Sequence, residues 1–382
     1  MKRSRKSKTA WIIIITVALL TAILISSAII SYTTVAISLP DELPEKLSVK
    51  NIISGLAGDG HKSEKEKYNF LLLGKDSGAA LSDVIMLASL DMKQGSLDVV
   101  QIPRDTYAKY GDASSSYKKI NAAPYKLGNE GFMRFLEKNL GIDIDYYISV
   151  SLDAVVSFVD SIGGLDVNIP MDMDYDDEYQ DLHIHLKAGQ NKLNGDEAEQ
   201  FIRFRAGYKD ADIGRMNAQK IFMASMLDKL SNGVSIKTVM SAVTSLLGRT
   251  ETNLTLVDCF KFMSYASEFD LNSVSFMTLP GNPAVAKLSG AGYYVINRSA
   301  AIETVNRYLN VKKKDITEST FDTMHVFENK DYDDFVQIYN SKEYKIRAYS
   351  ATEIMNGEIE FTMSEKAADN AALTARYLHK IY

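Results

Sequence analysis

Three apolar segments that follow one another after residue 68 indicate the fold class. Residues 69–74, 84–90 and 97–103 each have the length of a strand and lack the alternation of a half-exposed sheet. Such runs are typical of strands that are buried on both faces. Further strands are predicted at 145–151, 165–170 and 273–279, and helices at 130–140, 152–164, 212–230, 233–247, 255–268 and 293–310. The pattern predicts an α/β fold with a central, mostly buried mixed β-sheet flanked by helices.

The hydrophobic pattern at the N-terminus is different. Five cations and no acids stand in residues 1–10, and residues 11–39 contain no charge at all. A bilayer-spanning helix needs about 20 such residues. No small-residue cleavage site follows, so we expect one uncleaved transmembrane signal anchor. The cations then place the N-terminus in the cytoplasm, as a single-pass protein of the cell membrane with the rest of the chain outside.

The remaining boundaries follow from composition. Residues 40–67, with their prolines, glycines and charges, read as a juxtamembrane linker. The main domain is expected at 68–312. Beyond it the pattern weakens, and residues 313–382 are expected to form a small C-terminal appendage.

The charge balance restricts the possible ligands. Formal net charge is −6 for the 382 residues, and the first ten contribute +5, which leaves −11 on the expected exported part. An acidic domain is a poor partner for nucleic acid, so no nucleic-acid binding is expected. The single cysteine excludes an intramolecular disulfide.

The segment 200–219 holds the densest group of cations outside the N-terminus. Residues 200–205 alternate in the manner of a strand, which places Arg203 and Arg205 on one face. Two guanidiniums side by side can hold a phosphate-rich anion. The alternative is that these arginines pair with acidic neighbours on a solvated surface.

A helix is predicted to start directly after this strand. Asp212 can cap it, and Arg215 and Gln219 lie one turn apart on a shared face. The helix dipole, a guanidinium and an amide would then lie next to the arginine strand and favour an anion.

Other polar residues stand at the ends of the predicted strands. Asp76 follows one strand and Asp83 precedes the next, and two such carboxylates are usual ligands for a Mg²⁺ that also holds phosphates. Turn-capping aspartates are the alternative. Arg104 and Asp105 follow a third strand, and Lys119 adds a cation further along.

In this order the motifs resemble the LytR–CpsA–Psr family, whose members join secondary wall polymers to the bacterial wall. The pattern is G-x-D, S-D, I-P-R-D and K-I-N-A-A, followed by R-x-R…D-x-G-R-x-x-x-Q. The resemblance covers about residues 68–310, and the spacing of the arginine signature is its most specific part.

The resemblance implies an Mg²⁺-dependent phosphotransferase that attaches a polyprenyl-pyrophosphate-linked glycan, of teichoic acid or capsular polysaccharide type, to peptidoglycan. It also implies a metal site at Asp76 and Asp83 and an apolar tunnel for the lipid tail. The residues it implies for substrate contacts are Lys119, Arg215 and Gln219. The residues it implies for catalysis are Arg104, Asp105, Arg203, Arg205 and Asp212. Asp105 and Asp212 are both candidates for the general base.

One position departs from the family. Leu81 stands where the family usually has an arginine before S-D, and Lys75 is a possible substitute for the lost charge. Two alternatives therefore stay open. One is a hydrolase that uses water in place of the wall hydroxyl. The other is a non-catalytic anchored protein that binds the lipid-linked glycan or has a regulatory role.

Two other polar groups carry less functional weight. His183 and His185 alternate in a manner that resembles a zinc pair, but no third ligand accompanies them, so a solvated strand face is expected. The acidic run 172–179 lacks the glycine and the final glutamate of a calcium loop, and we expect an exposed loop there.

Overall fold

A computed structural model of the protein describes most of the chain after residue 64. The described residues are 65–75, 81–108, 110, 119–178, 182–209, 212–232, 234, 238, 242, 246, 250–255, 258, 262, 271–286, 291–312, 314–317, 319–320, 335–338 and 347–360. No helix among them is both long and apolar enough to cross a membrane. The predicted anchor at 11–39 lies outside the described residues, as do the linker up to residue 64 and most of the helices expected at 233–247 and 255–268.

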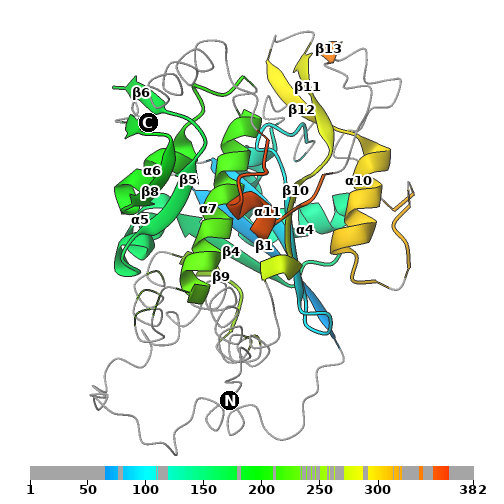
Figure 1. Ribbon diagram of the computed structural model, residues 1–382. Coiled ribbons are helices and arrows are strands. Elements are labelled where there is room, and N and C mark those ends of the chain that lie inside the picture. The colour runs from blue at the N-terminus through cyan, green and yellow to red at the C-terminus, as the bar shows by residue number, and fades with distance from the viewer. Residues whose placement is uncertain are drawn as a thin grey trace, which may run out of the picture.

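A seven-stranded sheet forms the centre of the molecule (Figure 1). Its order is β14-β10-β3-β2-β1-β4-β9. The strands are β1 (Lys67–Lys75), β2 (Ser82–Asp91), β3 (Ser96–Gln101), β4 (Tyr146–Ser151), β9 (Thr250–Thr252), β10 (Val274–Thr278) and β14 (Tyr349–Ser350).

The sheet is mixed, as predicted. β1 is parallel to β4 and β3 is parallel to β10, whereas β2 pairs antiparallel with both β1 and β3. β9 and β14 are antiparallel edge strands. The carboxyl ends of β1, β3, β4 and β10 therefore meet at one edge of the sheet, together with the start of β2. Ligand sites of α/β proteins lie at such edges.

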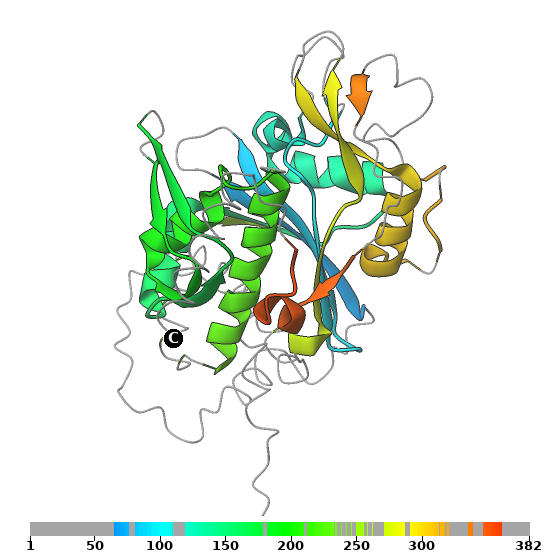
Figure 2. The same cartoon turned by 45° about the horizontal axis from the view of Figure 1, so that its top comes forward.

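Both faces of the sheet are covered, which explains the continuous apolar runs. Along β1, Phe70 belongs to one core cluster and its neighbour Leu71 to the other. The first core is closed by α5 (Leu152–Ser161), α6 (Gly195–Arg203) and α7 (Asp212–Asn232), and the second by α4 (Ala123–Leu140), α10 (Arg298–Thr304) and the π-helical turn η4 (Val305–Leu309). Figure 2 shows α5 and α7 on one side of the sheet and α4 and α10 on the other.

Smaller elements extend this frame. Two hairpin-like pairs, β5 (Leu165–Ile169) with β8 (Gly189–Leu193) and β6 (Met173–Asp177) with β7 (Leu182–Leu186), lie on the α5–α6 side. A second sheet, β12-β11-β13, consists of β11 (Gly281–Ala286), β12 (Gly292–Ile296) and β13 (Phe335–Ile338). Short 3-10 helices occupy Ile120–Ala122 (η1) and Leu271–Ser273 (η3).

The segment 347–360 joins the main domain. β14 pairs with β10 of the central sheet, and α11 (Ala351–Met355) packs with Ala351 and Ile354 in the same core as α7. The pattern placed these residues in a C-terminal appendage, but they lie in the sheet and core that begin at β1. The contacts that hold this segment join residues far apart in the sequence, such as Ser275 with Ser350 and Ser225 with Met355, and leave no local signal by which to find it.

Three predicted elements are wrong in part. Residues 200–205 are not a strand, because α6 continues to Arg203. The helix expected from 293 starts at Arg298, since 292–296 form β12. The acidic run 172–179 is not a loop throughout, because β6 occupies Met173–Asp177.

Candidate functional site

Four charged side chains meet at the sheet edge where β3 ends and β2 begins. Arg104 lies just after β3, Asp83 is the second residue of β2, and Asp212 and Arg215 belong to the first turn of α7. Arg104 Nη1 lies 2.5 Å from Asp83 Oδ1, and Arg104 Nε lies 3.2 Å from Asp212 Oδ1. Arg215 Nη2 lies 2.7 Å from Asp212 Oδ1, and its Nη1 lies 3.9 Å from Asp83 Oδ1. Each carboxylate thus lies between the same two guanidiniums.

Arg215 is the most buried member of this group, with only 5% of its surface exposed. Burial lowers the pKa of Arg215, and the nearby cations Arg104 and Arg205 lower it further, whereas Asp212 and Asp83 act in the opposite direction. Burial acts the same way on Arg104, but the two carboxylates outweigh it, so the pKa of Arg104 is raised. Among the described residues, Arg215 Nε finds no hydrogen-bond acceptor. Oxygen atoms of an anionic ligand would satisfy such a donor.

Two glutamine side chains hold α7 against the sheet at this point. Gln101, the last residue of β3, donates from Nε2 to Oε1 of Gln219 at 2.6 Å. Gln219 Nε2 donates to the carbonyl of Ile202 at 3.4 Å. Because Gln219 lies one turn after Arg215, these bonds fix the turn of α7 that presents the buried guanidinium.

A second ion pair lies beside the four-residue cluster. Lys119 Nζ is 2.9 Å from Asp105 Oδ1, and both side chains are about one-third exposed. Asp105 follows Arg104 directly, and its charge contributes to the raised pKa of Arg104. The structure therefore brings together Asp83, Arg104, Asp105, Lys119, Asp212, Arg215 and Gln219, all of which the sequence singled out.

The two arginines of the R-x-R motif are placed differently from the prediction. Arg203 is the last residue of α6 and pairs with Glu199 one turn earlier at 2.8 Å. Arg205 is an exposed residue outside any helix or strand, and it is close enough to Arg215 to lower the pKa of Arg215. The two guanidiniums hence do not project from one strand face. Arg205 nevertheless interacts electrostatically with Arg215 of the cluster.

The expected metal site is only half described. Asp76 lies outside the described residues, and Asp83 contacts Arg104. No group of three or more histidine, cysteine, aspartate or glutamate side chains within the described ranges is placed to hold a metal ion. Leu81, at the position of the missing arginine, is 41% exposed.

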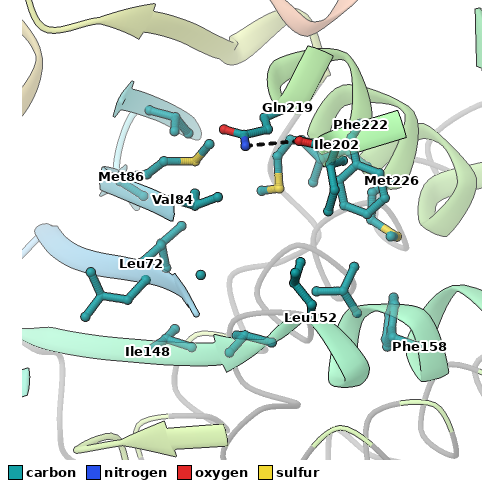
Figure 3. Close-up of a pocket in the computed structure, with 18 of the residues that line it drawn as sticks. Leu72, Val84, Met86, Ile148, Leu152, Phe158, Ile202, Gln219, Phe222 and Met226 are labelled. Atoms are coloured by element: carbon teal, nitrogen blue, oxygen red, sulfur yellow. Dashed lines mark hydrogen bonds between the residues drawn. The ribbon is translucent and has the colours of Figure 1, made fainter. Parts of the chain in front are cut away.

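An apolar cavity of about 190 Å³ lies between the sheet and α5 and α7 (Figure 3). Side chains from β1, β2 and β4 form one wall and side chains from the helices form the other; they include Leu72, Val84, Met86, Ile148, Phe158, Phe222 and Met226. Gln219 lies on the same wall as Phe222. The cavity therefore reaches the turn of α7 next to Arg215, and an apolar ligand in it would have its polar end at the charged cluster.

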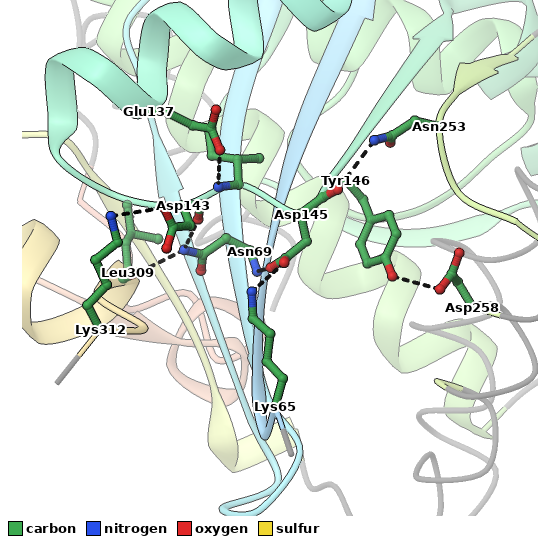
Figure 4. A network of polar contacts seen from close by, with 11 residues as sticks. Lys65, Asn69, Glu137, Asp143, Asp145, Tyr146, Asn253, Asp258, Leu309 and Lys312 are labelled. Atoms are coloured by element: carbon green, nitrogen blue, oxygen red, sulfur yellow. Dashed lines mark hydrogen bonds and ion pairs between the residues drawn. The ribbon is translucent and has the colours of Figure 1, made fainter. Parts of the chain in front are cut away.

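A polar network at the opposite edge of the sheet is structural (Figure 4). Lys65 forms an ion pair with Asp145, which also accepts a hydrogen bond from Asn69 N at 2.9 Å. The buried Asn69 amide donates to the carbonyls of Asp143 at 2.7 Å and Leu309 at 2.8 Å. These bonds fasten the start of β1 to the loop before β4 and to the end of η4.

The histidine pair lies on an exposed strand face, as predicted. His183 Nδ1 is 2.7 Å from Asp176, and His185 Nδ1 is 2.7 Å from Asp174 across the β6–β7 pair. The opposite face of β7, including Ile184, packs into the core.

Sequence reasoning did not find the cavity residues or Lys220. Lys220, on α7, is 3% exposed and donates to Asn217 Oδ1 at 3.0 Å and Thr278 Oγ1 at 2.8 Å. Its signal was a lysine followed directly by the apolar residues Ile221, Phe222 and Met223. A cavity has no such signal, because it is a volume that side chains leave unfilled.

Comparison with known proteins gives consistent matches. The model of the LytR_cpsA_psr family matches residues 33–310. The polyisoprenyl-teichoic acid–peptidoglycan teichoic acid transferase TagV of Bacillus subtilis is 29% identical over 253 residues, which cover 64% of each chain. The corresponding transferase TagU of Bacillus cereus is 32% identical over 248 residues, 64% of this chain and 79% of the relative. The chain thus spans just under two thirds of the length of TagV.

Solved structures share the fold. The crystal structure of B. subtilis TagV has a TM-score of 0.55 at 26% identity and covers 63% of this chain and 95% of that one. A Streptococcus agalactiae protein has a TM-score of 0.60 at 20% identity, with 70% and 95% covered.

Proposed function

The chain belongs to the LytR–CpsA–Psr family, and from this premise we propose that it transfers a wall polymer from a polyprenyl pyrophosphate lipid to peptidoglycan. The names of TagV and TagU support a teichoic acid as the polymer, and a capsular polysaccharide is the second candidate of the same chemistry. A phosphodiester would link the polymer to a hydroxyl of the wall.

The observation that carries this proposal is the position of the arginine cluster at one end of the apolar cavity. Gln219 lines the cavity, and Arg215 lies one turn before it with an unused buried donor. A molecule with a long apolar tail and a multiply charged anionic head matches this arrangement. A water-soluble nucleotide or sugar phosphate would leave the apolar side unused.

The reaction requires one bond to form and one to break. The acceptor hydroxyl oxygen attacks the phosphorus that carries the glycan. The bond from that phosphorus to the bridging oxygen of the pyrophosphate breaks, and polyprenyl phosphate leaves with the electron pair. Arg104 and Arg215 are placed to neutralise the charge that builds on the pyrophosphate oxygens, which is the main source of catalysis in such reactions.

The two candidate bases differ in their surroundings. Asp212 Oδ1 contacts both Arg104 and Arg215, so its role in this proposal is to position the two guanidiniums. Asp105 instead forms an ion pair with Lys119, whose side chain is 37% exposed, and we assign Asp105 as the carboxylate that accepts the proton of the attacking hydroxyl.

Mg²⁺ is the cofactor we propose. The Asp83 side chain is 33% exposed beside the arginines, and one or two carboxylates suffice for Mg²⁺ when substrate phosphates supply further oxygens. Asp83 therefore fits as one protein ligand, with Asp76 as the second. When bound, the ion would neutralise pyrophosphate charge. The uncharged segment 11–39 supports a membrane location with the domain on the outer side, where a polyprenyl-linked substrate would be presented.

The test uses the full chain in detergent, with a polyprenyl-pyrophosphate-linked teichoic acid, peptidoglycan, and either Mg²⁺ or a chelator. We expect metal-dependent attachment that is lost in Arg104→Ala and Asp83→Ala. Arg134→Ala is the control, because Arg134 is 65% exposed and pairs with Glu130 on the surface of α4. Release of free phosphorylated polymer would instead establish a hydrolase. Lipid bound without conversion would indicate a binding protein that Leu81 has left inactive.

A further inference from the structure

An aromatic side chain lies next to the ion pair of Asp105 and Lys119. Lys119 Nζ is 5.7 Å from the centre of the Tyr293 ring, and Tyr293 is a half-buried residue of β12. The group therefore combines an aromatic ring, an ammonium and a carboxylate at the surface of the protein. None of these three side chains is needed to build the apolar cavity or the arginine cluster.

Backbone contacts fix this group relative to the arginines. Tyr294 N donates to the carbonyl of Asp105 at 2.9 Å, and Tyr107 N donates to the carbonyl of Tyr294 at 2.8 Å. The Tyr107 and Tyr293 rings meet edge to face, with centres 5.3 Å apart and planes at 86°. The β11–β12 hairpin, which extends from the molecule in Figure 2, is hence attached directly to the residues that follow Arg104.

The described contacts form a continuous series from the cavity to this ring. Gln219 lines the cavity, and Arg215 one turn earlier contacts Asp212, which contacts Arg104. Asp105 is the next residue in the chain and contacts Lys119, which lies beside Tyr293. The order is an apolar wall, then guanidiniums, then an aromatic ring with hydrogen-bonding groups.

A glycosylated polyprenyl pyrophosphate has the same order of parts: an apolar tail, two phosphates and a sugar. One face of a sugar ring presents C–H groups, which pack on an aromatic ring, and its hydroxyls donate to carboxylates and accept from ammonium groups. We propose that Tyr293 and Lys119, next to Asp105, form the subsite for the first sugar of the lipid-linked donor. This inference rests on the proposed function and extends it to the glycan.

The neighbouring residues favour the donor sugar over a sugar of the acceptor. The Asp105 carboxylate is close enough to the Arg104 guanidinium to contribute to its raised pKa, so a sugar on a phosphate held by Arg104 would lie near Asp105 and its partner Lys119. An acceptor strand has no phosphate to place it there. The experiment below also includes a result that would assign the ring to the acceptor instead.

Binding to the full chain is measured with farnesyl pyrophosphate and with the same lipid carrying one glucose on its terminal phosphate. The variants are Tyr293→Phe, which keeps the ring, and Tyr293→Leu, which fills the same place without it. We expect wild type and Tyr293→Phe to bind the glucosylated lipid about fivefold to tenfold more tightly than the bare one. Tyr293→Leu should bind both equally, with an unchanged Kd for bare farnesyl pyrophosphate.

The bare lipid serves as the internal control for folding and for the proposed function. If wild type binds neither lipid, the proposed function fails and the sugar subsite fails with it. If wild type binds both lipids and the preference for the glucosylated one is absent or survives in Tyr293→Leu, only the sugar subsite is overturned. If Tyr293→Leu instead raises only the KM for a peptidoglycan fragment, the ring belongs to the acceptor and the donor assignment is wrong.

Discussion

The backbone of Gly214 lies directly against the aromatic ring of Tyr208. A Cβ placed on Gly214 would stand 2.2 Å from Cγ of Tyr208 and 2.4 Å from its Cβ. The Tyr208 ring is in turn held edge to face by Phe204, with centres 5.4 Å apart. The glycine of the D-x-G-R motif therefore lets the first turn of α7 pack closely against Tyr208. Asp212 and Arg215 belong to this turn, so the packing fixes their position.

Gly214→Ala should lower both stability and anion binding. The added methyl group must displace the rigid part of the Tyr208 side chain, and such overpacking costs about 1–3 kcal/mol. Urea unfolding and calorimetric binding of inorganic pyrophosphate measure the two effects. Gly292→Ala is the control, because its added Cβ meets nothing within 4 Å. Unchanged pyrophosphate binding in Gly214→Ala would show that the close approach does not position the arginine.

Arg215→Met should lower both ligand binding and stability. Burial disfavours the charged guanidinium and lowers its pKa. The substitution, however, also takes one partner from Asp212 and Asp83, which keep only Arg104 among the cations of the cluster. The free energy of unfolding should therefore fall by about 1–3 kcal/mol. Pyrophosphate binding should weaken about 100-fold or more, because charge-assisted hydrogen bonds to the phosphate are lost. Arg134→Ala should change neither quantity. A large loss of stability with intact binding would indicate that Arg215 is a structural ion-pair partner only.

The sequence was sufficient to predict those strands whose hydrophobic pattern directly reflects their burial in the structure. The runs around Phe70, Ile85 and Val99 lack alternation because each strand has a core on both faces. The motif residues Asp83, Arg104 and Asp212 also came together as expected, since strand ends and a helix start converge at one edge of the sheet.

The errors arose where two periods fit the same residues. Ile202 and Phe204 alternate with arginines, but Ala198, Phe201 and Ile202 are also buried with helical spacing. The capping box of Asn194 and Glu197, with bonds of 2.9 Å in each direction, was the signal that would have decided for the helix. At 292–296, the aromatic and β-branched run that contains Tyr293 was the corresponding strand signal.

The cavity is a property of packing, and Ala88→Leu tests it with two opposite effects. Ala88 is buried on β2 and lines the cavity, so a leucine would occupy part of the empty volume. We expect the free energy of unfolding to rise by about 0.5–2 kcal/mol and the affinity for farnesyl pyrophosphate to fall. Ala154→Leu is the matched control, because Ala154 is equally buried on α5 but does not line the cavity. It should destabilise the protein. Lipid binding that survives Ala88→Leu while stability rises would place the tail elsewhere.

Lys220 predicts a specific pH dependence of stability. Burial lowers the pKa of Lys220 from 10.5 to about 7, and the groups that its ammonium contacts, Asn217 and Thr278, are uncharged. Between these two pH values the unfolded chain binds more protons at this residue than the folded one. The contribution of Lys220 to stability is therefore fully present above pH 10.5 and is lost as the pH falls to about 7, with a slope of at most about 1.4 kcal/mol per pH unit.

Lys220→Met should remove this slope, because methionine has no proton to exchange and keeps the apolar stem in place. Urea unfolding of both proteins at pH 7, 8 and 9 gives the difference, and other titrating groups cancel in the comparison. Lys93→Met, at a lysine that is 68% exposed on the β2–β3 turn, should leave the wild-type slope unchanged. Parallel curves for wild type and Lys220→Met would mean that Lys220 is charged in the folded protein at neutral and alkaline pH. In that case an anion must lie close to it.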